Sequence, residues 1–250
     1  MNLEYKLNSN ESERYKRQLL LETDYGFSQK KLKQATVFIA GAGGLGSSAS
    51  IYLAAAGVGR LIIADYDLID MSNLNRQILY STAAIGELKA ESARRRLTEL
   101  NPEIAVEIRT VKLEGDISKL IDGADLIIDC LDNIETRYVL NDFSLKTRIP
   151  IVHGGINGYA GQISFIAPPE TACLRCIFPD AYKADGPIPV IGATAGIIGS
   201  MQAMEAVKYL TESGELLKNK LLIIDGFTWE IANLNLERNP SCRACGASSA

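Results

Sequence analysis

A glycine-rich loop, GAGGLG, lies between an apolar run at 37–40 and a small-residue segment at 47–56. Its glycines are Gly41, Gly43, Gly44 and Gly46. Between a strand and a helix, such a loop lets the backbone approach a phosphate, and the helix N-terminus favours negative charge. Asp65 ends the next apolar run, where a carboxylate can accept hydrogen bonds from ribose hydroxyls. Loop and acid together indicate a nucleotide site, but NAD, FAD, ATP and tight packing without a ligand all remain open.

The polar residues that follow favour a triphosphate. They are Asp67, Asn73, Arg76, Gln77 and Lys89. Guanidinium and ammonium groups offset the charge of a triphosphate and of its transition state, whereas a dehydrogenase has no need for them here. The run DCLDN at 129–133 follows another apolar stretch, and a carboxylate at such a strand end can hold Mg²⁺. We therefore expect ATP with Mg²⁺, although each charged residue taken alone is equally typical of a solvated surface.

Four of the five cysteines form two Cys-x-x-Cys pairs. They are Cys173 with Cys176 and Cys242 with Cys245. Because no secretory signal is visible, these pairs predict a metal site before disulfides. Four thiolates favour a closed, structural Zn²⁺ site, and two redox disulfides are the alternative. The fifth cysteine, Cys130, and the single histidine, His153, are interpreted as packed core residues.

The composition predicts a cytoplasmic globular protein. Hydrophobic residues make up 47% of the 250-residue chain and the formal net charge is −4, so we expect neither nucleic acid nor membrane as a partner. The polar N-terminus argues against a signal peptide. The charge-free stretch 186–204 contains prolines and glycines, which favours a buried helix over a membrane span.

Apolar runs alternate with helical patterns over most of the chain. Strands are predicted at 37–40, 61–64, 105–111, 126–128 and 149–152, and helices at 11–21, 47–56, 89–100 and 135–146. Further strands at 161–166, 221–224 and 231–236 and a helix at 194–210 extend this pattern. The expected fold is α/β, with a Rossmann-like, mostly parallel sheet, helices on both faces and C-terminal antiparallel strands.

These motifs together resemble the ThiF/MoeB/HesA adenylyltransferases, which are related to ubiquitin-activating enzymes. The resemblance covers about residues 13–246. Its carriers are RYKRQ at 14–18, the loop at 41–46, ADYD at 64–67, SNLNRQ at 72–77, GELK at 86–89, DCLDN at 129–133, GSMQAMEA at 199–206 and the four cysteines. The expected organisation is an N-terminal helical segment 1–34, an adenylation domain 35–246 and a tail 247–250.

The resemblance implies a role for each matching residue. Gly44 would lie against the phosphates, and Asp65 would bind ribose. Asn73, Arg76 and Lys89 would contact the triphosphate. Asp132 would serve Mg²⁺ and the adenylation chemistry. Arg17 would reach into the site of a neighbouring subunit, so the resemblance implies a homodimer.

The resemblance leaves the carboxylate substrate open. The usual substrate is the C-terminal glycine of a ubiquitin-like sulfur-carrier protein. A small-molecule carboxylate is the alternative, as in the member HcgE, which adenylates guanylylpyridinol. Several members carry a cysteine in the loop corresponding to 180–191, but this chain has none there and has Asp185 near that place. We therefore expect the reaction to stop at the acyl-adenylate, or to pass it to a reactive cysteine on an acceptor protein.

Two other function classes compete with adenylation. One is an NAD-dependent oxidoreductase, but the short-chain type needs Tyr-x-x-x-Lys, and no tyrosine here has a lysine four residues later. The other is a non-catalytic scaffold, which the presence of Arg76, Lys89 and Asp132 disfavours.

Overall fold

The computed structural model describes residues 6–179, 186 and 188–246. Asp185 and the tail 247–250 lie outside them. Within the described residues, strands form one sheet in the order β3-β2-β1-β4-β5-β6-β7-β8. They are β1 (Thr36–Ala40), β2 (Arg60–Ala64), β3 (Ala105–Arg109), β4 (Leu126–Asp129), β5 (Ile151–Asn157), β6 (Ala160–Ile166), β7 (Lys220–Asp225) and β8 (Glu230–Asn235).

The sheet changes from parallel to antiparallel at β5. Strands β3, β2, β1, β4 and β5 pair in parallel, and β6, β7 and β8 are added antiparallel. The carboxyl ends of the parallel strands therefore meet at one edge, where open α/β sheets place ligand sites. The predicted α/β fold is confirmed. The predicted strand 105–111 ends at Arg109, the last residue in register with β2.

Helices cover both faces of the sheet. They are α1 (Ser9–Arg14), α2 (Lys16–Leu19), α3 (Leu21–Asp24), α4 (Gln29–Gln34), α5 (Gly44–Ala56), α6 (Lys89–Leu100), α7 (Ile134–Thr147), α8 (Leu174–Ile177) and α9 (Gly192–Thr211), with short 3₁₀ turns η1 (Met71–Asn73) and η2 (Thr82–Ala84). Alternate residues of β1 separate two cores. Val37 and Ile39 pack with α5, α6 and α9, whereas Phe38 and Ala40 pack with α7 and the segment 113–124.

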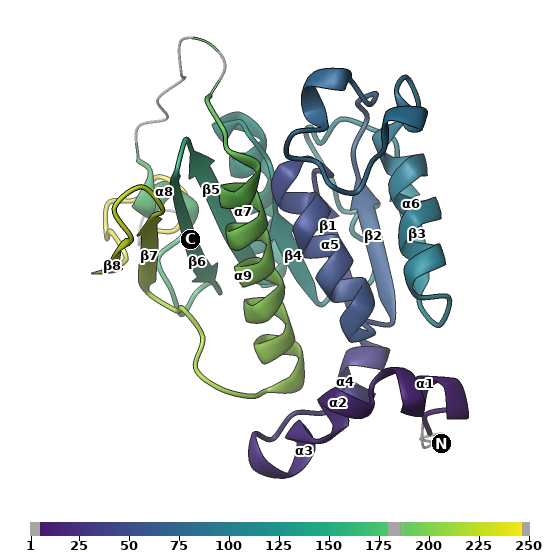
Figure 1. Ribbon diagram of the computed structural model, residues 1–250. Coiled ribbons are helices and arrows are strands. Elements are labelled where there is room, and N and C mark those ends of the chain that lie inside the picture. The colour runs from purple at the N-terminus through teal and green to yellow at the C-terminus, as the bar shows by residue number, and fades with distance from the viewer. Residues whose placement is uncertain (1–5, 180–185, 187, 247–250) are drawn as a thin grey trace.

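Helices α5 and α9 pack closely together (Figure 1). A Cβ on Gly199 of α9 would lie 2.5 Å from the backbone oxygen of Leu45 and 2.8 Å from the Cβ of Ser48, so only glycine permits this approach. The small, uncharged residues of α9 up to 204 are therefore explained by helix packing. Among the described residues, no helix combines the length and the hydropathy that crossing a membrane requires.

The predicted single helix at 11–21 is wrong, because the chain turns at Tyr15. This residue ends α1 and precedes α2, and its side chain is 1% exposed. The Tyr15 hydroxyl accepts a hydrogen bond from Asn101 Nδ2 at 2.9 Å, and its ring lies against Gly57, just beyond α5. Burying this ring interrupts the helix, which sequence periodicity alone did not indicate.

Candidate nucleotide site and cysteine cluster

The four loop glycines meet different constraints. A Cβ on Gly46 would lie 2.0 Å from the Gly41 oxygen, and Gly41 has φ +94° with the Cys130 oxygen 2.9 Å from its Cβ position. These two glycines are required by the fold. A Cβ on Gly44 would lie 3.0 Å from that of Ala195, so Gly44 lets α9 approach. At Gly43 the nearest of the described atoms would be 3.7 Å away, an ordinary contact distance, so packing alone does not require a glycine there.

Gly43 also caps the helix that follows the loop. It is the N-cap residue of α5 and supplies no side-chain hydrogen bond, and its oxygen accepts the N–H of Ser47 at 2.8 Å. The first N–H groups of a helix have no partner within the helix and attract anions. Loop and helix together therefore form a site suited to phosphate groups.

Asp65 holds the glycine loop in place. Its carboxylate accepts the backbone N–H of Ala42 at 2.8 Å through Oδ2 and that of Asp67 at 2.9 Å through Oδ1. Burial raises the pKa of Asp65, while these N–H donors and the charge of Lys89 oppose the rise. Each oxygen keeps a second lone pair for a ribose hydroxyl.

Tyr80 also binds the backbone of the glycine loop. Its hydroxyl donates to the oxygen of Ala42 at 2.7 Å, and burial raises its pKa. Both backbone groups of Ala42 are therefore fixed by side chains that follow β2. The sequence did not single out Tyr80.

Arg76 and Gln77 lie beside the loop. A Cβ on Gly44 would be 3.6 Å from Arg76 Cγ, and the Gln77 amide nitrogen is the atom nearest to the Cβ position of Gly43. Arg76 Nη1 donates to the oxygen of Ser72 at 2.9 Å. Gln77 is 4% exposed, and its buried Oε1 has no hydrogen-bond partner among the described residues.

Lys89 joins the site through Asp67. Its Nζ lies 2.8 Å from Asp67 Oδ2, and the Lys89 side chain is 7% exposed. Lysine has three donors, so this pairing leaves the ammonium able to bind a phosphate oxygen. Asn73 has a local contact instead, because its Oδ1 accepts the N–H of Asp70 at 3.2 Å and closes a capping box at η1.

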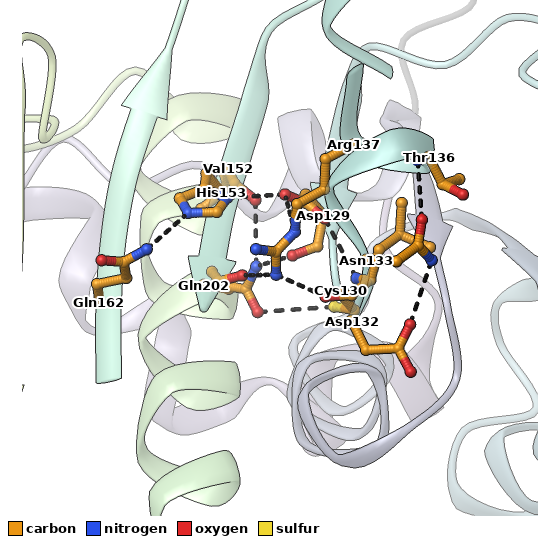
Figure 2. A network of polar contacts seen from close by, with 12 residues as sticks. Asp129, Cys130, Asp132, Asn133, Thr136, Arg137, Val152, His153, Gln162 and Gln202 are labelled. Atoms are coloured by element: carbon orange, nitrogen blue, oxygen red, sulfur yellow. Dashed lines mark hydrogen bonds and ion pairs between the residues drawn. The ribbon is translucent and has the colours of Figure 1, made fainter. Parts of the chain in front are cut away.

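Asp132 is exposed in the turn between β4 and α7 (Figure 2). Its Oδ1 accepts a hydrogen bond from Asn133 Nδ2 at 3.3 Å. The preceding strand lies next to β1, so Asp132 shares the carboxyl edge of the sheet with the glycine loop. An exposed carboxylate at this edge is accessible to a cation.

Cys130 and His153 are buried core residues, as predicted. Cys130 is 8% exposed and burial raises the pKa of its thiol. His153 lies in β5, is fully buried, and its Nδ1 is 2.7 Å from Asp129 Oδ2.

Arg17 is not brought to the site of its own chain. It is exposed on α2. The next residue of that helix, Gln18, donates to the oxygen of Ala56 at the last turn of α5. The glycine loop lies at the first turn of that helix, about 18 Å away for thirteen helical residues. Figure 1 shows α1 to α4 beyond the end of the sheet opposite to the loop.

The four paired cysteines form one cluster. Their sulfur atoms all lie within 4.8 Å of one another, and the contacts Cys173–Cys176, Cys173–Cys242 and Cys176–Cys245 measure 3.8, 3.8 and 3.4 Å. Sulfurs around a tetrahedral Zn²⁺ at about 2.3 Å would be roughly 3.8 Å apart, whereas a disulfide needs about 2.05 Å. The described cysteines form no disulfide, and the cluster fits a metal ion better than two disulfides.

Comparison with known proteins identifies the family. A model described as "ThiF family" matches residues 15–244. The chain belongs to the ThiF family. It is 41% identical to "Adenylyltransferase and sulfurtransferase MOCS3" of Drosophila yakuba over 97% of this chain and 55% of that protein. It is 38% identical to MOCS3 of Culex quinquefasciatus over 96% of this chain and 56% of that protein. The chain therefore spans about half the length of these curated relatives.

Solved ThiF-like structures share the fold. E. coli MccB with MccA-N7isoASN superposes with a TM-score of 0.86 at 26% identity, covering 98% of this chain and 76% of MccB. E. coli MccB with ATP superposes with a TM-score of 0.83 at 25% identity, covering 93% of this chain and 74% of MccB. PaaA, at 21% identity and a TM-score of 0.81, covers 94% of this chain and 87% of its own and shows the fold alone.

One functional candidate was missed from sequence. Arg137 in α7 is 14% exposed and lies 3.3 Å from the buried carboxylate of Asp129. Arg137 follows Asp129 by eight residues, and this spacing matches no periodicity that predicts a contact. Only the structure reveals the pairing.

Proposed function

We propose that this ThiF protein adenylates a carboxylate with ATP. A carboxylate oxygen of the substrate attacks the α-phosphorus, a new P–O bond forms, and the bond to the β-phosphate oxygen breaks. The products are an acyl-adenylate and pyrophosphate. Arg76 and Lys89 stabilise the negative charge that moves onto the leaving group, and no protein nucleophile is needed.

This proposal rests on one observation: groups that bind anions and carboxylates that bind cations lie together at one edge of the sheet. Gly43 stands at the N-terminus of α5, where packing does not require a glycine, and Arg76 lies beside Gly44. Lys89 pairs with Asp67, which follows the Asp65 that holds the glycine loop. Asp132 stands on the neighbouring strand end. A nicotinamide dinucleotide would not require this concentration of cations.

Asp132 is proposed to serve Mg²⁺. Its carboxylate is exposed, and carboxylate oxygens are the ligands that a hard cation prefers. Mg²⁺ is typically bound by one or two carboxylates together with substrate phosphates. When bound, Mg²⁺ would offset part of the negative charge of the triphosphate. Asp132 orients that charge against the glycine loop.

The proposed substrate is the C-terminal carboxylate of a protein or peptide, with a ubiquitin-like sulfur carrier as the leading candidate. Exposed Tyr159, Phe227, Trp229 and Ile231 lie on the β5–β6 turn and the β7–β8 hairpin. A pocket of about 170 Å³ joins this surface to the first turn of α9. Gly192 of that turn contacts the backbone of Asn75, next to Arg76.

This surface favours a protein over a small carboxylate such as guanylylpyridinol. A small acid needs an enclosed pocket, whereas exposed aromatic residues are typical of protein interfaces. A flexible tail laid across the pocket would deliver its terminal carboxylate toward Arg76. With no cysteine at 180–191, transfer to a cysteine of a downstream acceptor protein would follow.

We also propose a homodimer. Four apolar side chains are exposed between α2 and α3, just after α3, on α5 and on α9: Leu20, Tyr25, Tyr52 and Met204. In the proposed dimer, a second copy packs against these side chains and brings its own Arg17 to the nucleotide site of this chain. Within one chain Arg17 lies at the opposite end of α5 from the glycine loop, so a role for Arg17 at the nucleotide requires a second copy.

The cysteine cluster is proposed to hold one structural Zn²⁺. Its four ligands come from α8 and from the segment after β8, so the ion would link distant parts of the chain. All four positions are protein thiols, so no position is left for substrate.

The test is pyrophosphate exchange with candidate carboxylates, comparing the wild type with Asp132→Asn. We expect the variant to lose at least ~100-fold in kcat while it keeps its fold. Asp122→Asn is the matched control, because Asp122 is exposed beside Arg60 at the opposite edge of the sheet. Calorimetry should show binding of ATP and not of NAD⁺. Full turnover in Asp132→Asn, or tight NAD⁺ binding without ATP binding, would refute the proposal.

A further inference from the structure

A buried charged cluster lies beside the loop that carries Asp132 (Figure 2). Asp129 and His153 are fully buried and Arg137 is 14% exposed. The carboxylate Oδ2 of Asp129 lies 2.7 Å from His153 Nδ1 and 3.3 Å from Arg137 Nε. The chain thus buries an ion pair and a histidine in its core, at the base of a proposed catalytic loop.

The cluster is electrically balanced. Burial opposes ionisation of Asp129, but the charge of Arg137 and the hydrogen bond from His153 outweigh it and lower the pKa of Asp129. Burial lowers the pKa of His153, which is therefore neutral near pH 7. Its Nδ1–H donates to Asp129, and its Nε2 faces Gln162 Nε2 at 3.4 Å. One positive and one negative charge remain, and each has its partner.

The same side chains grip the backbone of Leu131, the residue before Asp132. Asp129 Oδ1 accepts the N–H of Leu131 at 3.2 Å. Arg137 Nη2 donates to the oxygen of Leu131 at 2.5 Å and to the oxygen of Gly154 at 2.8 Å. Both backbone polar groups of Leu131 are therefore tied to the cluster, and through it to β5.

The residue after Asp132 is fixed as well. Asn133 is the N-cap of α7, and its Oδ1 accepts the N–H of Thr136 at 2.9 Å. Its Nδ2 donates to the Asp132 carboxylate. Asp132 is exposed to solvent, but the backbone on both sides of it is held.

The held segment also packs against the glycine loop. The N–H of Cys130 donates to the oxygen of Ala40 at 3.0 Å, and a Cβ on Gly41 would lie 2.9 Å from the Cys130 oxygen and 3.7 Å from Leu131 Cδ2. The backbone that carries Asp132 therefore sets its distance from the loop proposed to bind phosphates.

We propose that Arg137, together with Asp129 and His153, is a positioning residue that fixes the Asp132 carboxylate relative to the glycine loop. This inference rests on the proposed function of Asp132 in adenylation. Buried ion pairs seldom add net stability over apolar residues of similar size, so stability alone does not explain the cluster. A catalytic group needs placement within about 0.5 Å, and a hydrogen-bonded support of this kind provides it.

The experiment compares Arg137→Met, Arg137→Lys and the matched control Arg96→Met, an exposed arginine of α6. Circular dichroism checks folding, calorimetry gives the ATP Kd, and pyrophosphate exchange gives kcat and KM. We expect Arg137→Met to lower kcat by at least ~10-fold, because Asp132 is displaced, while the ATP Kd changes by less than ~2-fold. Arg137→Lys should also lose activity, because one ammonium cannot reproduce the planar contacts to two carbonyls and a carboxylate.

A double variant separates positioning from a general structural role. If Arg137 acts through Asp132, adding Arg137→Met to Asp132→Asn should lower kcat by less than a further ~2-fold. Losses that multiply in the double variant would overturn the inference. So would a folded Arg137→Met with the kcat of the wild type, even if Asp132→Asn is inactive and the proposed function stands. Full turnover in Asp132→Asn would overturn both.

A histidine pair decides the question if Arg137→Met does not fold. His153→Asn keeps an N–H near the position of Nδ1, whereas His153→Phe removes it. We expect His153→Asn to retain most of the kcat and His153→Phe to lose it without a change in ATP Kd. Equal kcat values in the two variants would overturn the inference.

Discussion

Removal of the metal from the cysteine cluster tests how the C-terminal part of the chain is held. The ion would join Cys173 to Cys242, which lie 69 positions apart in the chain. The loop-closure relation gives about 4 kcal/mol for a cross-link of this span. For a protein of this size, 1 kcal/mol shifts Tm by about 2–4 °C, so loss of the ion should lower Tm by roughly 10 °C.

The assay is calorimetric unfolding of protein purified without chelators, before and after removal of the metal. Elemental analysis should find one zinc per chain in the starting material. Cys242→Ser should start with the lower Tm and show no further shift with chelator, which controls for effects of the chelator elsewhere. Reductant alone should leave Tm unchanged, because the sulfur separations exclude disulfides. Absence of zinc, or a Tm that does not respond to chelation, would refute the reasoning.

Three further predictions address the nucleotide site and its surroundings. His153 is the single histidine and burial lowers its pKa, so protonation favours the unfolded chain. The free energy of unfolding should therefore fall below about pH 6.5, by up to about 1.4 kcal/mol per pH unit, and denaturant titrations of His153→Phe should lack this slope. Gly46→Ala should cost at least about 2 kcal/mol through its backbone clash, whereas Gly43→Ala should unfold like the wild type but bind ATP at least ~10-fold more weakly in calorimetry. Arg17→Ala and Asp132→Ala should each be inactive, and exchanged mixtures should regain part of the activity; full activity in Arg17→Ala, or mixtures that stay inactive, would contradict a role across a dimer.

The sheet and the glycine loop were predictable from sequence because their signals are local. An apolar run followed by four glycines predicts a strand and a tight turn into a helix. The next apolar run, which ends in an acid, predicts the second strand. Cysteine spacing likewise predicted the cluster, since two chelating pairs have a small set of uses.

The contacts that were not predicted depend on residues far apart in sequence. Tyr15 breaks the first helix because its ring fits against Gly57 and Asn101, which no periodicity at 11–21 reveals. His153 was correctly expected to be packed, but its bond to Asp129 depends on β4 and β5 lying side by side. Arg137 was missed for the same reason. The sequence also did not show that Arg17 lies far from the glycine loop, because this depends on α2 packing against the last turn of α5.

The position of β1 in the sheet has a consequence for folding kinetics. Val37 pairs with Leu61, which lies nearby in the chain, and also with Leu126, which lies much later. The half-sheet of β1, β2 and β3 can form from one continuous segment, whereas docking of β4 must close a long loop and is slower. Because β4 carries the backbone that packs on Gly41, we expect the ability to bind ATP to appear late in refolding, after most secondary structure has formed.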